Sequence, residues 1–296
     1  MTDTSKKAQR QGLRRREALA LLPLLAAPWP ALAQTDLTDL ERVRATGTLK
    51  VAVYKDNAPF SSGPVADMKG LDVSLAEALA RKMNLKLSLL PFDAGENMGD
   101  DLRNMVWRGH YLGYGPADVM LQVPADRYLA NANPQVAIIS PYMRQSNVLL
   151  HDTRRLADAA SPEDLKGQAL AAEKGSGAAS VLMGYGGGLL RNQVAIFNSG
   201  VEAAQAVLDG KAVGAFVSRA QAESVLSRQP AAAAQFRISK ITFNNGIVDN
   251  GWPVGLAIKS SNKNLGEALD TAMKAIRESG EMLAIFNQHG LTLTAP

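Results

Sequence analysis

Short apolar runs alternate with longer amphipathic segments in the first half of the chain, and this alternation limits the possible folds more than any other sequence feature. The segments, in order, are TLKVAVY (48–54), LDVSLAEALARKMN (71–84), LKLSLLPF (85–92), GDDLRNMVWRG (99–109) and ADVMLQV (117–123). Leu71, Leu75 and Leu79 recur at helical spacing, whereas the short runs have the length of strands. A strand–helix–strand–helix–strand order predicts a parallel sheet with helices on both faces.

The same order repeats further along the chain and predicts a second α/β unit. Its expected strands are QALAAEKG, NQVAIFN and AVGAFVS, and its expected helices are SGAASVLMGY, GVEAAQAVLDG and RAQAESVLSRQ. Extended segments near 143–150 and 241–256 connect the two units, and a helical pattern covers 264–290. We therefore expect two parallel-sheet lobes joined by two crossing segments. Lobe 1 would comprise 34–145 plus 251–296, and lobe 2 would comprise 146–250.

Residues 1–33 have the features of a secretory signal peptide. Basic residues precede an apolar core from Ala18 to Ala27, and Ala31-Leu32-Ala33 forms a small-residue cleavage site. Adjacent arginines before the apolar run leave both Sec and twin-arginine export open. A membrane anchor fits less well, because the apolar run is far shorter than the ~20 residues that a bilayer requires. We expect a cleaved leader and a periplasmic protein.

The formal net charge of +4 belongs to this leader. Of the 32 basic and 28 acidic side chains, the leader holds six and two, which leaves 26 of each. A neutral mature chain without a basic patch argues against nucleic-acid binding.

The motifs of common enzymes and metal sites are absent from the sequence. Because there is no cysteine, disulfides, thiolate metal sites, a cysteine nucleophile and covalently attached c-type haem are excluded. The three histidines form no H-x-x-x-H pair, and no G-x-S-x-G, P-loop or G-x-G-x-x-G pattern occurs. We expect no metal and no cofactor.

A series of motifs along nearly the whole mature chain resembles one family. The motifs are LKVAVYKDNAPFS, KGLDVSLAEALARKM, ADVMLQVPADR, SPYMRQSNVLL, SPEDLKGQALAAEKGSGA, AAQAVLDGKAVGAFV and WPVGLAIKSSNKNLGEALDTAMKAIRESGEMLAIFNQHG. Their order resembles the periplasmic solute-binding proteins of ABC importers, of the amino-acid type (family 3). The resemblance implies a two-lobed periplasmic-binding-protein fold of type II, with a ligand cleft between the lobes.

The sequence departs from the family's amino-acid binders where they hold their ligand. Arg127 matches the arginine that pairs with the ligand's carboxylate, but Val123 and Pro124 stand where a hydroxyl side chain is expected. Val213 and Ser218 occupy the two acidic positions that would hold the ammonium group. A standard amino-acid ligand is therefore not expected.

Eight residues, HYLGYGPA (110–117), separate Gly109 from Asp118 where plain amino-acid binders have a short turn. We expect this insertion at the carboxyl edge of the sheet, where ligands of open α/β folds bind. Together with its flanking residues, in the segment ENMGDDLRNMVWRGHYLGYGPADVM, the insertion resembles that of the solute-binding-like proteins encoded with PQQ-dependent alcohol dehydrogenases, the MoxJ type. That resemblance implies a periplasmic accessory protein of a quinoprotein dehydrogenase.

The candidate ligand-binding residues are Phe60, Tyr111, Tyr114, Arg127, Ser176, Ser218 and Trp252. Several of these residues have an alternative role that is structural and does not involve ligand binding. Arg127 could form a surface ion pair, and the two tyrosines could pin the insertion instead of forming the rim of the cleft. Ser176 could cap a helix without presenting N–H groups to an anion, and Trp252 could pack the hinge.

Three functions remain open at this point. The first is an exported accessory factor of a PQQ-dependent, methanol-type dehydrogenase, with a small molecule or a partner in the cleft. The second is an ABC-importer receptor for a small polar solute that is not a standard amino acid, with a permease as partner. The third is a periplasmic dehydratase-like enzyme, which would need a general acid or base in the cleft. Since both expected acidic positions are changed, we expect a protein that is not an enzyme.

Overall fold

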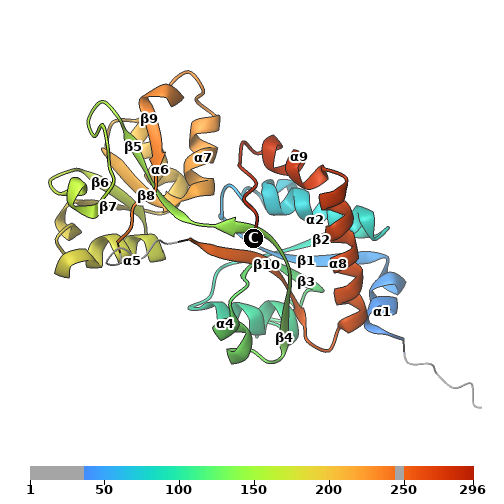
Figure 1. Cartoon of the computed structure of the whole chain (residues 1–296). Helices are drawn as coiled ribbons and strands as arrows, with labels where there is room; N and C mark the ends of the chain where they lie inside the picture. The colour runs from blue at the N-terminus through green and yellow to red at the C-terminus, as the bar shows by residue number, and fades with distance from the viewer. Residues whose placement is uncertain (1–36, 244–249) are drawn as a thin grey trace, which may run out of the picture. The chain divides into compact units, whose positions relative to one another are not determined.

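The computed structural model describes residues 37–243 and 250–296, which contain two five-stranded sheets (Figure 1). The predicted signal peptide, residues 1–33, lies outside the described residues. Within the described ranges, none of the helices has the length and apolar character needed to cross a membrane.

The first sheet has the strand order β2-β1-β3-β10-β4. Its strands are β1 (Thr48–Tyr54), β2 (Lys86–Phe92), β3 (Val119–Pro124), β4 (Val136–Gln145) and β10 (Trp252–Lys259). β1 pairs in parallel with β2 and β3, whereas β10 runs antiparallel to both β3 and β4. The sheet is therefore mixed, because β10, which returns from the second sheet, runs antiparallel to both of its neighbours.

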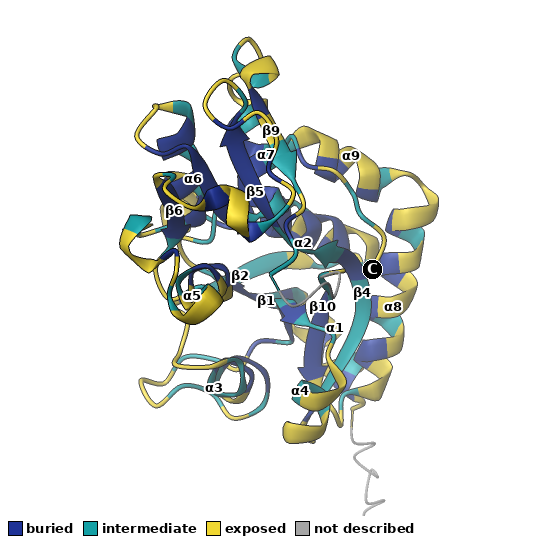
Figure 2. Cartoon of the chain, turned by 60° about the vertical axis from the view of Figure 1, so that its left-hand side comes forward, coloured by how far each residue is buried: buried dark blue, intermediate teal, exposed yellow. Residues whose placement is uncertain are grey.

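Helices cover both faces of the first sheet. They are α1 (Asp39–Thr46), α2 (Leu71–Lys82), α3 (Met98–Leu102) with the π-helical turn Arg103–Trp107, α4 (Arg127–Ala132), α8 (Lys263–Glu278) and α9 (Glu281–Gln288). One core contains residues of α1, α2, α8 and α9, and a second core on the other face contains residues of α3 and the π-helical turn. The buried stripe of α8 faces inward while its outer side is exposed (Figure 2).

The second sheet has the order β7-β6-β8-β5-β9. Its elements are β5 (Asn147–Asp152), β6 (Leu170–Glu173), α5 (Gly177–Gly184), β7 (Val194–Phe197), α6 (Gly200–Leu208), β8 (Gly214–Ser218), α7 (Arg219–Ser227) and β9 (Phe236–Ser239). α5 packs on one face, and α6 and α7 pack on the other. β6 pairs in parallel with β7 and β8, and β5 runs antiparallel to β8.

The chain passes between the sheets at Ser146, which separates β4 from β5. It returns between β9 and β10, and residues 244–249 of this return lie outside the described ranges. Gln145 at the end of β4 is opposite Trp252 at the start of β10, so the two passages lie side by side. The C-terminal tail adds a further link, because the Thr292 backbone N–H donates to Glu223 of α7 and the Arg144 N–H donates to the Thr294 carbonyl.

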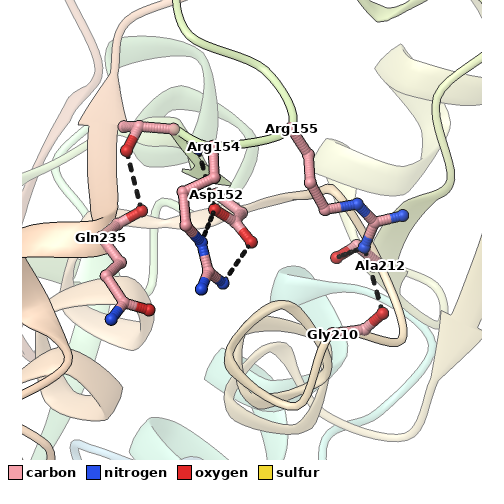
Figure 3. Close-up of polar contacts among 7 residues, drawn as sticks. Asp152, Arg154, Arg155, Gly210, Ala212 and Gln235 are labelled. Carbon is pink, nitrogen blue, oxygen red and sulfur yellow. Dashed lines mark hydrogen bonds and ion pairs between the residues drawn. The ribbon is translucent and has the colours of Figure 1, made fainter.

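β5 ends in a turn that polar contacts anchor to its neighbours (Figure 3). The Arg154 guanidinium donates two hydrogen bonds, of 2.9 and 2.7 Å, to the two carboxylate oxygens of Asp152. This pairing lowers the pKa of the Asp152 carboxyl. Arg155 donates to the Gly210 carbonyl at 3.1 Å. These polar contacts therefore fix the C-terminal end of β5, the strand that follows the first passage between the sheets.

The predicted α/β class, with strands and helices in the expected order, is confirmed. The prediction did not include α1, α4, β9 or most of β4, of which only 143–145 falls within a predicted extended segment. The lobe boundaries stay a prediction.

Candidate functional site

A cavity of about 380 Å³ lies where the two sheets present the carboxyl ends of their parallel strands. This is the edge at which open α/β folds bind ligands. Fourteen residues line it: Asn57, Phe60, Gln122, Gln145, Asn147, Glu173, Ser176, Gly177, Ala178, Val181, Val217, Ser218, Gln221 and Trp252. They come from both sheets and from both passages of the chain.

The wall from the first sheet contains two aromatic rings, of Phe60 and Trp252, and three amides, of Asn57, Gln122 and Gln145. Asn57 and Phe60 belong to the loop that follows β1. The loop is clamped on the start of α2, because the Asp72 backbone N–H donates to the Phe60 carbonyl at 2.9 Å. Gly70 permits this approach, since its φ is +137° and an added Cβ would collide with that carbonyl. Phe60 is thereby fixed in place at the cavity.

Gln122 has an unusual backbone conformation for a strand residue. Its φ is +61°, in the left-handed region that residues other than glycine rarely adopt. The side chain amide donates to the buried carboxyl of Asp72 at 3.3 Å, and the Tyr142 hydroxyl donates to the same oxygen at 2.9 Å. Strained residues of this kind concentrate at ligand sites. The Asp72–Tyr142 pair therefore supports Gln122 from beneath.

Burial is the main cause of the raised pKa values of Asp72 and Tyr142. Asp72 is 1% exposed, and burial raises the pKa of its carboxyl to about 7 despite the two donated hydrogen bonds. Burial also raises the pKa of Tyr142, so its hydroxyl remains a donor. The pair holds a proton in neutral solution more readily than an exposed carboxyl would.

The wall from the second sheet is organised by a chain of hydrogen bonds. Ser218 ends β8 and caps α7, since its hydroxyl accepts from the Gln221 N–H and its own N–H donates to the Gln221 side chain oxygen at 3.0 Å. The Gln221 amide then donates to Glu173 Oε2 at 2.9 Å. Gly200 leaves the space that Gln221 occupies, because a Cβ there would overlap it. The carboxylate of Glu173 is thus held at the end of β6.

Ser176 both lines the cavity and caps α5. Its hydroxyl accepts from the Ala179 N–H at 3.0 Å and donates to the Glu173 carbonyl at 2.9 Å. The capping alternative therefore describes its contacts. Trp252 begins β10 and lines the cavity while packing against the first core, so both of its predicted environments occur together.

The other sequence candidates lie outside this lining. Arg127 is the exposed first residue of α4, directly after the capping Asp126. Tyr111 is 87% exposed at the tip of the 110–117 loop, whereas Tyr114 is half-buried and packs on the core with His110 stacked on it. The structure brings Phe60, Ser176, Ser218 and Trp252 together and leaves Arg127, Tyr111 and Tyr114 apart.

The expected position of the loop at the carboxyl edge is wrong. The loop leads from a helix into β3, so it reaches the amino end of that strand. Asp118 pairs there with Lys50 of β1, through two hydrogen bonds of 2.7 and 2.9 Å. Gln122, at the other end of β3, is the residue that reaches the cavity.

Sequence reasoning missed Glu173 and the five amide side chains of the lining. Neutral amides have no recognisable spacing, so no pattern could have selected them. Glu173 had one usable signal, because it is the last residue of a strand and precedes a Gly-Ser-Gly turn. Among the described residues, no group of three or more acidic, histidine or cysteine side chains is placed to bind a metal ion.

Solved structures with the same fold include several amino-acid-binding proteins. An ancestral cationic amino acid solute binding protein (AncCDT-1) matches with a TM-score of 0.67 and 19% identity, over 86% of this chain and 100% of that one. A substrate-binding protein of an amino acid ABC transporter from Streptococcus pneumoniae, bound to L-arginine, matches with a TM-score of 0.60 and 18% identity, over 87% and 100%. A mutant of ArgBP from T. maritima gives 0.58 and 19%, over 85% and 98%.

The chain therefore has the two-lobed, type II fold of amino-acid-type solute-binding proteins, which confirms the predicted fold class. At these identities the likeness shows the fold. No protein-family profile matches the sequence, and no curated protein matches it either.

Proposed function

We propose that this chain is an exported solute-binding protein that holds a small polar molecule in the cavity between its two sheets. The observation that carries the proposal is the lining itself. Five amides, two hydroxyls and two aromatic side chains converge from separate elements at the carboxyl ends of the strands, as in preformed ligand sites. The similar structures support it, since their names describe binding proteins for amino acids.

The ligand that we propose is not a standard amino acid. Arg127, the residue expected to hold a carboxylate, is exposed and outside the lining. Ser218 stands at one acidic position of the family, and Val213 at the other is buried in the core of the second sheet. The described lining therefore does not contain the pair of groups that would recognise an α-carboxylate together with an α-ammonium.

A binding role also fits the cavity better than a catalytic one. One similar structure is described as a precursor of cyclohexadienyl dehydratase, so the fold is compatible with an enzyme. In the described part of this chain, Glu173 is the single titratable side chain of the lining. A dehydratase would have this one carboxyl as its general acid or base, whereas the amides and hydroxyls that make up the rest of the polar lining suit ligand binding.

Fluorescence titration tests the binding proposal, because Trp252 lines the cavity and Trp107 does not. Protein without residues 1–33 would be titrated with the twenty L-amino acids and with panels of polyols, sugars and amines. We expect at least one non-amino-acid solute to change the Trp252 signal, and Trp252→Phe to abolish that change. A micromolar affinity (about −8 kcal/mol) for any standard amino acid would contradict the proposed ligand class.

As the partner, we propose a PQQ-dependent alcohol dehydrogenase. The sequence resemblance of the 96–120 segment supports this choice, and so does the exposed tip of the 110–117 loop, where Leu112 is 68% exposed next to Tyr111. An ABC permease is the alternative partner. The loop is remote from the cavity, so it can contact a partner while the cavity is filled.

Substitution of the loop tip tests the partner. We expect Tyr111→Ala combined with Leu112→Ala to leave the melting temperature unchanged, because both side chains are exposed, and to reduce co-purification with the dehydrogenase. Tyr128→Ala is the matched control, since Tyr128 is 83% exposed on α4. Equal co-purification of the wild type, the double variant and the Tyr128→Ala control with the dehydrogenase would count against this partner.

A further inference from the structure

The charge of the cavity lining is unbalanced. Among the described lining residues, Glu173 is the one carboxylate, and none is a lysine, arginine or histidine. The remaining polar groups are amides and hydroxyls, which are uncharged. A ligand that enters this site therefore meets one negative charge, and no positive one, from the described part of the lining.

Glu173 is positioned but not neutralised. Gln221 donates to its Oε2 oxygen, and Ser218 holds Gln221 through the α7 cap. No ion pair with Glu173 occurs within 37–243 and 250–296. Its Oε1 oxygen has no hydrogen-bond donor among these residues. Gln221 therefore orients the Glu173 side chain without neutralising its negative charge, so a ligand can pair with it.

A filled cavity would remove water from this carboxylate, and burial of an unpaired charge is unfavourable. A ligand with a protonated nitrogen compensates that cost directly, whereas an anionic ligand increases it. The aromatic side chains of Phe60 and Trp252 also line the cavity, and an aromatic ring attracts a cation that lies over its face. The amides can then bind hydroxyl or carbonyl groups of the same molecule.

We infer that the ligand is a small organic amine without a carboxylate, bound with its cationic nitrogen at Glu173. This inference rests on the proposed solute-binding function and names the class of solute. Glu173 is the residue that selects the charge of the ligand, and Gln221 positions Glu173.

Isothermal titration calorimetry with matched pairs of probes tests the inference. Each pair keeps the size and replaces the cation: choline with 3,3-dimethyl-1-butanol, putrescine with 1,4-butanediol, and ethanolamine with ethylene glycol. We expect at least one amine to bind at least about tenfold more tightly than its neutral partner. Glu173→Gln keeps an acceptor for Gln221 and should weaken that amine by at least about 30-fold, the loss typical of a buried charge pair that loses one partner. The control Glu96→Gln changes an exposed acid outside the lining and should have no effect.

The melting temperature of Glu173→Gln should match that of the wild type, which separates a lost charge from a lost fold. Neutral probes that bind as tightly as the amines, or an unchanged amine affinity in Glu173→Gln, would overturn the inference. Absence of amine binding at millimolar concentrations would overturn it as well. If a neutral or anionic solute then changes the Trp252 signal, the solute-binding proposal survives. If no solute of any class does so, both proposals fail.

Discussion

Asp72 shows how one buried residue makes the stability of the whole protein depend on pH. Its carboxyl lies beneath the cavity, with Tyr142 and Gln122 as donors, and its pKa is about 7. An unfolded aspartate loses its proton near pH 3.9. Between these values the native state binds more protons than the unfolded chain, so the free energy of unfolding falls as pH rises.

Asp72→Asn is expected to remove this decrease of the free energy of unfolding with rising pH. Asparagine keeps an oxygen that accepts from Tyr142 and carries no charge to bury. The variant should therefore be more stable than the wild type above pH 7, by an amount on the order of 1–3 kcal/mol, and the difference should shrink towards pH 4. Urea unfolding at several pH values measures this. Parallel pH profiles for the two proteins would show that the Asp72 carboxyl titrates normally.

At the scale of elements, the two passages between the sheets depend on a glycine. Gly251 has a φ of +69°, and a Cβ on it would overlap the carbonyl oxygen of Gln145. A larger residue would separate β4 from β10 at the point where both leave the first sheet. Gly113, in the 110–117 loop, has a φ of +85° but nothing within 4 Å of an added Cβ.

The two glycines therefore form a matched test. Gly113→Ala should cost about 1 kcal/mol, the price of a left-handed conformation alone. Gly251→Ala should cost roughly 1–3 kcal/mol more, because the backbone must also move, and it should change the fluorescence of the adjacent Trp252. Denaturant unfolding of both variants gives the comparison. Equal losses of stability would mean that the two passages can separate without strain.

At the scale of the whole molecule, sequence periodicity predicted the layers better than the site. The run 48–54 coincides with β1 because a buried central strand has a clear apolar pattern. α4 was missed because six residues are too few to show helical periodicity. β10 was recognised only as part of an extended segment, and only residues 143–145 of β4 fell within one. The pairing of these two strands could not be predicted, since it depends on how distant segments meet.

The candidate site was predicted in part. Of the residues named from the sequence, Phe60 in the loop after β1, Ser176 in the turn after β6, Ser218 at the end of β8 and Trp252 at the start of β10 line the cavity. Glu173 was overlooked because the family's acidic positions lie elsewhere in the sequence. The loop was assigned to the wrong edge because its glycines and tyrosines suggested binding, whereas the direction of β3 places it at the amino end.

Strand β3 separates two surfaces that can evolve as independent traits. Its six residues span about 20 Å, with Gln122 at the cavity and Asp118 just before the other end, beside Lys50. A mutation in the loop tip leaves the cavity lining untouched, and a mutation of a lining amide leaves the loop unchanged. If the cavity binds a solute and the loop binds a partner, as we propose, descendants of this protein can lose one kind of recognition and retain the other, and their ligand preference need not reveal their partner.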